Sequence, residues 1–179
     1  MNHSMIQKKM MIMKKKHKKS DRKQLMIVDG SNLAHRAYQK FEKLRSYNGV
    51  PTGLIYGFMR LLNSYLIRFR PGYLIITFDT KQSKESNLLG SYKKHRENIS
   101  MDYESFNKQL RTVKKILKYL NIPVVWDKKG LGHESDDYIG HYALNHNGKV
   151  LIISSDKDFC QLIDSNIKIY NPFKECIIQ

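Results

Sequence analysis

Carboxylates placed close behind apolar runs are the residues of this sequence best suited to chemistry. Asp29 follows the run 25–28, Asp79 follows 73–78, and Asp156 with Asp158 follows 150–153. Continuous apolar runs of this length predict strands that are buried on both faces, as in a parallel sheet. One aspartate after a strand is explained equally well as a turn residue. Three repetitions of the pattern favour a shared role.

A second group of acids lies in the segment 132–140, where Glu134, Asp136 and Asp137 precede an apolar helical pattern. If the helix begins near Glu134, then Glu134 and Asp137 lie one turn apart on one face, with Asp136 beside them. Acids in a first turn also suit the positive end of the helix dipole. The segment alone therefore leaves both interpretations open.

Together these acids predict a metal site. Right-handed crossovers bring the ends of parallel strands to one edge of a sheet, and carboxylates that meet there cannot all stay ionised without counter-cations. Oxygen ligands suit hard divalent ions, Mg²⁺ or Mn²⁺, which can generate hydroxide and stabilise charge on a phosphodiester in reaction. The candidate metal ligands are Asp29, Asp79, Glu134, Asp136, Asp137, Asp156 and Asp158.

The elements that position these acids alternate between strand and helix. Amphipathic or capped patterns predict helices over 32–41, 54–69 and 103–120 and from about 134, and further strands over 122–126 and 167–170. This alternation is typical of a doubly wound, mainly parallel α/β sheet. At 179 residues, the chain is expected to form one folded domain over 24–179.

The charge predicts a polyanionic partner. The net charge is +16, and part of the excess lies in residues 1–23, where Asp21 is the only acid. The lysine-rich segment 1–23 lacks an apolar period and is expected to be a disordered basic arm. Nucleic acid is the expected partner. No apolar run reaches membrane-spanning length, and we expect a cytoplasmic protein in a bacterial or phage-infected cell.

The long polar segment 80–101 interrupts the alternation of strands and helices. It carries Tyr92, Lys93, Lys94 and Arg96. A solvated basic loop accounts for this composition, but long loops in compact domains are often functional. Cations suit phosphate contacts and an aromatic ring suits base stacking, so these four residues are candidates for binding nucleic acid.

In their order and spacing, five motifs resemble the 5′-nuclease superfamily, which includes the 5′→3′ exonuclease domain of bacterial DNA polymerase I and the phage flap endonucleases. The motifs occupy 27–32, 78–79, 92–96, 132–137 and 153–158. The resemblance implies a PIN-like 5′-nuclease core with a basic helical arch over 80–101. It implies that Lys93 and Arg96 act on the scissile phosphate and that Tyr92 stacks on a base.

The implied activity is divalent-metal-dependent hydrolysis of phosphodiester bonds at 5′ ends or flaps of DNA, or at RNA primers, in replication and repair. The family continues with acids for a second metal ion and a helix–hairpin–helix region, which this sequence lacks before Gln179. We therefore expect a fragment or a split-gene product, with two ions in the complete protein and a C-terminal half supplied in trans. A catalytically impaired DNA-binding fragment and a PIN-type ribonuclease are the alternatives.

Overall fold

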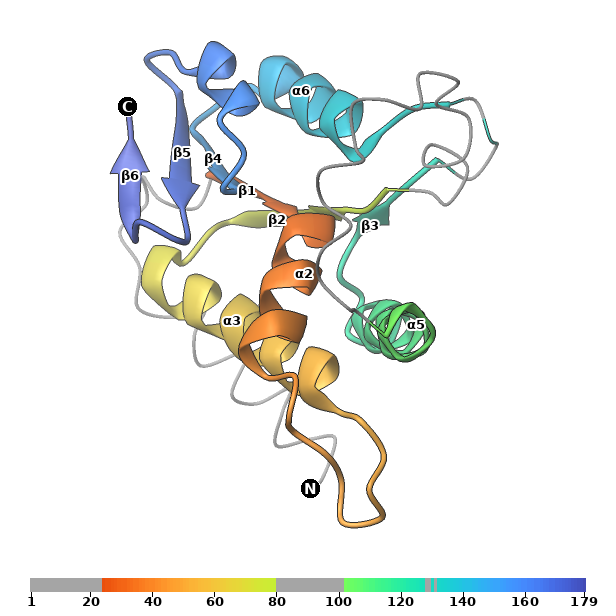
Figure 1. Ribbon diagram of the computed structural model, residues 1–179. Helices are drawn as coiled ribbons and strands as arrows, with labels where there is room; N and C mark the ends of the chain where they lie inside the picture. The colour runs from red at the N-terminus through yellow and green to blue at the C-terminus, as the bar shows by residue number, and fades with distance from the viewer. Residues whose placement is uncertain (1–23, 80–101, 128–129, 131) are drawn as a thin grey trace, which may run out of the picture.

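A computed structural model of the protein describes residues 24–79, 102–127, 130 and 132–179 (Figure 1). The described residues form one sheet in the order β3-β2-β1-β4-β5-β6. Its strands are β1 (Leu25–Asp29), β2 (Tyr73–Thr77), β3 (Val124–Val125), β4 (Val150–Ile153), β5 (Ile167–Asn171) and β6 (Cys176–Ile178). The expected arm 1–23 and the expected arch 80–101 lie outside the described residues.

Helices cover both faces of this sheet. One face carries α2 (Gly30–Lys40), α3 (Gly53–Phe69) and α5 (Tyr103–Tyr119), and the other carries α6 (Ser135–Asn145) and the 3₁₀ helix η3 (Asp158–Leu162) (Figure 1). Each layer has its own apolar cluster: Phe58 and Leu117 belong to the first, and Ile139 and Phe159 to the second. The doubly wound α/β architecture predicted from the sequence is confirmed.

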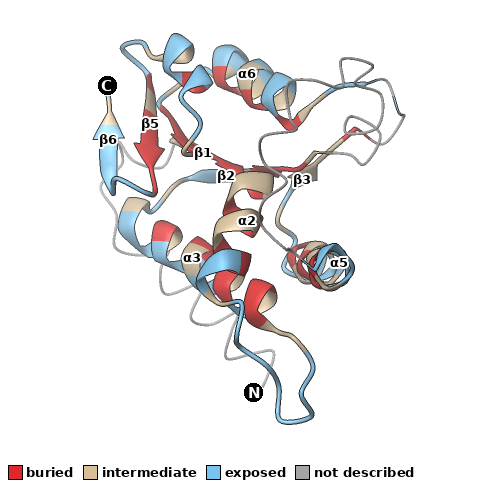
Figure 2. Cartoon of the chain, viewed as in Figure 1, coloured by how far each residue is buried: buried red, intermediate tan, exposed pale blue. Residues whose placement is uncertain are grey.

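Burial on both faces explains the apolar runs. In β1, Met26 and Val28 belong to the cluster beneath α2 and α3, while Leu25 and Ile27 belong to the cluster beneath α6. Successive side chains of a strand point to opposite faces, so a strand between two helical layers needs apolar residues throughout. Figure 2 shows the burial concentrated in the strands and on the sides of the helices that face them.

Parallel pairing brings the carboxyl ends of the central strands together. Asp29 of β1 pairs with Thr77 of β2, and Val28 pairs with Ile153 of β4. Helix α2 begins at once at Gly30, where a Cβ atom would lie 2.6 Å from the carbonyl oxygen of Thr77. Helix α2 can therefore start directly against β2 because this position has no side chain.

Helix α5 caps helix α3. The N-cap residue of α3, Thr52, makes no side-chain capping bond. Instead, the Leu54 N–H donates to Oε1 of the buried Gln109 on α5 at 3.0 Å, and Nε2 of Gln109 donates to Ser105 Oγ at 3.1 Å. A buried glutamine thus satisfies one of the free N–H groups at the start of α3.

The chain differs from the sequence prediction in its shorter elements. Helix α2 begins at Gly30 instead of Asn32, and the strand expected over 122–126 is reduced to Val124–Val125. Neither η3 nor β6 was predicted, and β6 pairs antiparallel with β5. The sheet is therefore mainly parallel, with one antiparallel strand at its edge.

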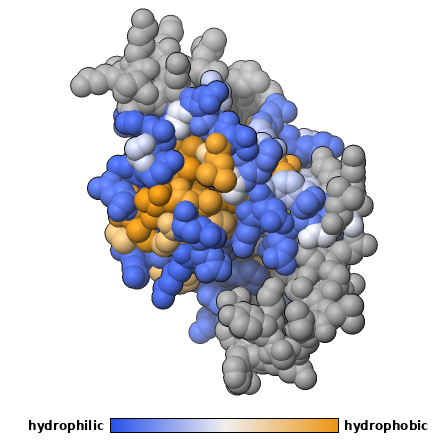
Figure 3. All heavy atoms as spheres, turned by 90° about the horizontal axis from the view of Figure 1, so that it is seen from above, coloured by the Kyte–Doolittle hydropathy of each residue, from blue (hydrophilic) through white to orange (hydrophobic). Residues whose placement is uncertain are grey.

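The surface on the side of the sheet that carries α6 and η3 includes an apolar region. Seen from this side, hydrophobic atoms gather within a hydrophilic surround (Figure 3). Leu162, Ile163 and Ile178 of the underlying cluster are only partly buried. None of the helices in the described part of the chain combines the length and hydrophobicity that a membrane crossing requires.

Candidate active site

Five of the seven predicted ligands are electrostatically coupled at the carboxyl edge of the sheet. Asp29 ends β1, Asp79 and Asp156 follow β2 and β4, and Glu134 and Asp136 come from the start of α6. The charges of Asp79 and Asp156 raise the pKa of Asp29, and the charges of all four other acids raise the pKa of Asp136. Acids that are far apart in the sequence thus share one electrostatic environment.

Asp29 is the most deeply placed acid of this group, with 7% of its surface exposed. Its Oδ1 accepts from the Asn32 N–H at 2.9 Å, which caps α2, and its Oδ2 accepts from Ser154 Oγ at 3.0 Å. Burial raises the pKa of Asp29 to about 6, against the lowering effect of these two hydrogen bonds. One carboxylate therefore begins helix α2, contacts the end of β4 and faces the other acids.

Helix α6 is fixed to β2 through its first residue. The Ser135 N–H donates to Asp79 Oδ1 at 3.0 Å, and Ser135 Oγ donates to Thr77 Oγ1 at 2.7 Å. The start of α6 and the start of α2 approach the sheet from opposite faces (Figure 1). This arrangement brings Asp136 to the strand ends, where partial burial and the charges of Asp29 and Asp79 raise its pKa to about 7.

Two predicted ligands, Asp137 and Asp158, make contacts outside the group of five coupled acids. Asp137 Oδ2 accepts from the Glu134 N–H at 3.0 Å and lies 3.8 Å from His133 Nδ1, so this acid serves the start of the helix. Asp158 is exposed at the start of η3, and its N–H donates to Asp156 Oδ1 at 2.9 Å. The structure thus couples five of the seven acids electrostatically at one edge of the sheet, and Asp137 and Asp158 have other contacts.

Small polar residues that the sequence prediction missed connect the parts of the site. Ser31 Oγ accepts from the Asp79 N–H at 3.0 Å, and Asn32 Nδ2 donates to Ser155 Oγ at 2.7 Å. With Ser154, they join the ends of β1, β2 and β4. Each of these hydroxyl and amide residues lies within three positions of a predicted acid in the sequence, and that proximity was the available signal.

Lys114 is a further missed residue. Its Nζ lies 4.6 Å from the ring centroid of Phe78 and 5.3 Å from that of Trp126. Burial lowers the pKa of Lys114, and the negative charge of Asp79 opposes this effect. The α5 helix therefore supplies a partly buried cation next to the acid group.

The acids suit a hard divalent cation in their chemistry. Carboxylate oxygens are the ligands such ions prefer, and the hydrogen bonds to Asp29 and Asp79 leave lone pairs on their oxygens. Among the described residues, however, no three His, Cys, Asp or Glu side chains converge as closely as one ion requires. Exposed acids such as Asp136 would have to approach the buried Asp29 for an ion to be held.

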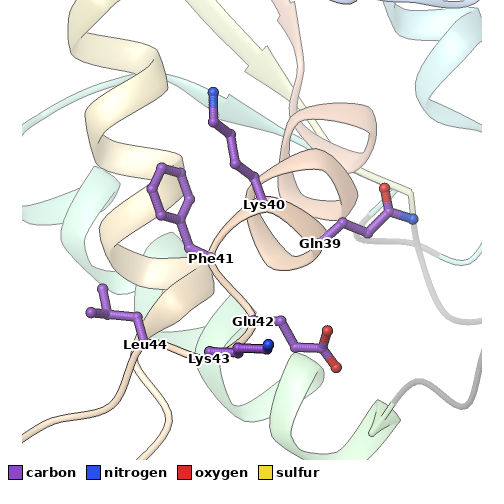
Figure 4. A pocket seen from close by; sticks show the side chains of 6 residues that line it. All are labelled: Gln39, Lys40, Phe41, Glu42, Lys43 and Leu44. Atoms are coloured by element: carbon purple, nitrogen blue, oxygen red, sulfur yellow. The ribbon is translucent and has the colours of Figure 1, made fainter.

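A hollow of about 410 Å³ at the end of α2 is separate from this site. It is lined by the consecutive residues 39–44, whose side chains point in different directions (Figure 4). Glu42 is its one acid. These side chains do not converge on a common point, so we assign no chemistry to this hollow.

Comparisons with known proteins agree with this geometry. Residues 24–179 match the family described as "5'-3' exonuclease, N-terminal resolvase-like domain". A protein named 5'-3' exonuclease from Aquifex aeolicus (strain VF5) is 35% identical over 157 residues, which is 86% of this chain and 52% of that protein. DNA polymerase I of Caldicellulosiruptor bescii is 31% identical over 148 residues, 81% of this chain and 17% of that enzyme. The chain thus spans about half of the exonuclease and a smaller part of the polymerase.

Solved structures share the fold. The T5 D15 protein co-crystallised with metal ions superposes with a TM-score of 0.66 at 17% identity, over 87% of this chain and 58% of that one. A complex of the bacteriophage T5 D15 flap endonuclease with DNA and metal ions gives 0.62 at 17% identity, over 87% and 57%. The α/β core described above is the part that these proteins have in common.

Proposed function

Since this chain belongs to the family of 5′-3′ exonuclease N-terminal domains, we propose that it is the metal-binding core of a 5′→3′ exonuclease or flap endonuclease. Its reaction would be hydrolysis of phosphodiester bonds at 5′ ends or flaps of DNA. The observation that carries the proposal is the coupled acid group, in which Asp29 and Asp136 have raised pKa values because of burial and of the charges of neighbouring acids. Such perturbed acids are typical of functional sites.

The acid group is proposed to hold Mg²⁺ or Mn²⁺, with Asp29, Asp79, Glu134, Asp136 and Asp156 as ligands. The T5 structures with metal ions, one of them with zinc, support a divalent ion in general, and the oxygen donors of this chain favour Mg²⁺ or Mn²⁺. When bound, such an ion supplies an activated water and stabilises charge on the phosphate. Two ions are proposed for the complete protein.

The protein's own contribution is positioning. The Asn32 N–H and the Ser154 hydroxyl both donate hydrogen bonds to the Asp29 carboxylate and fix it. The Ser135 N–H fixes Asp79 in the same way. Fixed acids limit the reorganisation that ion binding requires. This preorganisation is the reason for expecting the strand ends to define where the phosphate reacts.

The partners proposed for the whole protein are DNA with a 5′ end or flap, or an RNA–DNA hybrid. Because the chain spans about half of the 5'-3' exonuclease from Aquifex aeolicus, a C-terminal half, fused or in trans, belongs to this proposal. Replication and repair in the cytoplasm would be its setting. One observation favours a DNA-binding fragment of low activity as a second candidate: the described acids do not yet converge on an ion.

The decisive experiment is single-turnover cleavage of a labelled 5′-flap substrate in Mg²⁺. We expect metal-dependent cleavage that Asp156→Asn slows by about a hundredfold or more, because the charge of Asp156 acts on both Asp29 and Asp136. Glu104→Gln, at an exposed acid in the first turn of α5, is the matched control and should cleave like wild type. Addition of the C-terminal region should accelerate cleavage.

Binding without cleavage, with and without that region, would support the DNA-binding fragment and reject the enzyme. Cleavage restricted to RNA would support the ribonuclease alternative.

The arch residues give a second prediction. Lys93 and Arg96, which lie outside the described residues, are three residues apart and on a helix would face one phosphate path. Lys93→Ala or Arg96→Ala should slow cleavage by about a hundredfold with little loss of DNA affinity, because the charge acts on the transition state. Lys115→Ala on α5, at an exposed lysine, should change neither quantity. Equal losses of affinity and rate in Lys93→Ala would contradict the arch assignment, including the proposed phosphate and base contacts of Lys94 and Tyr92.

A further inference from the structure

Helix α5 brings a lysine, Lys114, to the carboxyl edge of the sheet. Its Nζ lies 4.6 Å from the ring centroid of Phe78 and 5.3 Å from that of Trp126. Phe78 comes directly after β2 and Trp126 directly after β3, and α5 packs near β3 (Figure 1). The ammonium therefore lies over two rings at the ends of neighbouring strands, where the faces of the rings attract a cation.

The strand ends beneath Lys114 are rigid. Phe78 is 1% exposed and belongs to the apolar cluster on this face of the sheet. Its N–H donates to the carbonyl oxygen of Val125 at 2.9 Å, which joins the end of β2 to β3. A lysine on an open surface has a flexible stem and a mobile charge. Lys114 is half-buried against these strand ends, so its charge stays close to them.

The charge of Lys114 interacts with Asp79, the residue that follows Phe78. Burial lowers the pKa of Lys114, and the negative charge of Asp79 opposes that effect. No carboxylate among the described residues lies within ion-pair distance of Lys114, so the two charges act on each other across a gap. The Asp79 carboxylate also accepts from the Ser135 N–H at 3.0 Å. Helices on both faces of the sheet thus act on Asp79, α6 through a hydrogen bond and α5 through a charge.

The acid group needs a counter-charge when no ion is bound. The charge of Asp79 raises the pKa of Asp29 and also that of Asp136, so Asp79 repels both of these neighbours. Carboxylates that repel one another move apart or take up protons unless a cation lies near them. A fixed ammonium beside Asp79 offsets part of this repulsion before any ion has bound.

We propose that Lys114 is a positioning residue, a counter-cation that keeps Asp79 at the acid group in the metal-free protein and weakens the binding of a divalent ion there. The inference rests on the proposed function for the presence of the ion. Without the ammonium, the metal-free acid group should be less stable. The ion should bind more tightly, because it no longer meets a like charge beside one of its ligands. Lys114 would thus preorganise the site without allowing it to hold an ion permanently.

The first test is a double-mutant cycle of Lys114→Met and Asp79→Asn, measured by thermal unfolding of the purified chain in EDTA at pH 8. Methionine keeps an unbranched stem that packs on aromatic rings, and asparagine keeps an oxygen for the Ser135 N–H. Lys114→Met should lower the Tm by about 3 °C more in the wild-type background than in Asp79→Asn, because only the carboxylate loses a counter-charge. Lys114→Arg keeps a cation that stacks on rings and should restore the Tm. Lys115→Met, at the exposed neighbouring position, should act alike in both backgrounds.

The second test measures the Kd for Mn²⁺ from the electron paramagnetic resonance signal of the free ion, without DNA. Lys114→Met should lower this Kd by about threefold, because a like charge next to a proposed ligand is removed. Lys114→Arg keeps the charge and should bind Mn²⁺ like wild type. Lys115→Met should also bind like wild type, because solvent screens an exposed charge. A role in packing alone predicts the opposite sign, since a poorly packed site would bind the ion more weakly.

Equal changes of Tm for Lys114→Met in the two backgrounds would overturn the proposal, because the ammonium would then not act through Asp79. Unchanged or weaker Mn²⁺ binding in Lys114→Met would overturn it as well. Neither test depends on cleavage. A wild-type protein that binds no Mn²⁺ would reject the proposed metal site itself, whereas the thermal cycle contains no ion and decides the coupling of Lys114 to Asp79 separately.

Discussion

Asp29→Asn should abolish cleavage while it makes the metal-free protein more stable. The carboxylate is buried, and its pKa is raised from 3.8 to about 6. A shift of this size means that the ionised carboxylate costs about 3 kcal/mol of folding free energy at pH 8. Asparagine removes that charge, keeps an oxygen for the Asn32 N–H, and remains a good N-cap residue. Cleavage should fall on the order of a thousandfold or more, because the variant loses a proposed ligand of the ion.

Chemical denaturation in EDTA at pH 8 measures the free energy of unfolding, and the flap assay measures the rate. Asp29→Ala provides the comparison, because it removes the charge and also the cap, which is worth about 1 kcal/mol. Its gain in stability should therefore be smaller than that of Asp29→Asn. An Asp29→Asn protein that unfolds more easily than wild type at pH 8 would show that the buried charge is compensated within the apo fold.

The metal-free protein should lose stability as the pH rises from 5 to 8, and a divalent ion should restore it. The folded pKa values of Asp29 and Asp136 lie above 3.8, at about 6 and about 7. Between pH 3.8 and about pH 7 the folded state therefore holds more protons than the unfolded state. The free energy of unfolding falls as the pH rises through this range. Over the whole range from acid pH to pH 8 Asp29 accounts for about 3 kcal/mol, and about half of this loss falls between pH 5 and pH 8. Asp136 makes a smaller contribution to the loss of stability in the same direction, because solvent screens its exposed side chain.

Melting curves between pH 5 and pH 8 test this expectation in EDTA, in MgCl₂ or MnCl₂, and in NaCl of matched ionic strength. At a hundredfold excess over its Kd, the ion should add about 2.7 kcal/mol, and most at pH 8, where the acids are ionised. Asp136→Asn should reduce the pH dependence by a smaller amount than Asp29→Asn. A Tm in EDTA that rises between pH 5 and pH 8 would contradict the pKa shifts, and equal curves in MgCl₂ and NaCl would contradict a metal site.

The fold was predictable where burial left a strong pattern. Strands β1, β2 and β4 lie between two helical layers, so nearly every residue in them is apolar and the runs are visible in the sequence. Strand β3 has two residues, and β6 has three that are mostly exposed. Neither length nor burial marks such strands in the sequence. Their pairing with β2 and β5 is a tertiary effect.

The site was predictable to the level of the strand ends but not to that of single carboxylates. Asp136 and Asp137 are neighbours in the sequence, and only the residue at which α6 begins decides which one faces the strands. Because Glu134 is the N-cap, Asp137 accepts its N–H and Asp136 faces the coupled acids. The contact of Ser154 with Asp29 depends on strand register, which no local pattern encodes.

The hydrogen bond from the Leu54 N–H to Gln109 makes one amide a reporter for the docking of a helix. Amides in the first turn of a helix ordinarily exchange with solvent quickly, because they have no partner within the helix. Leu54 has its partner on α5, so its protection from hydrogen exchange lasts only while α5 stays packed on α3. Helix α5 also follows the segment 80–101 directly in the chain. The exchange rate of this single amide would therefore report whether a ligand that binds to 80–101 strengthens or weakens the packing of α5 on α3.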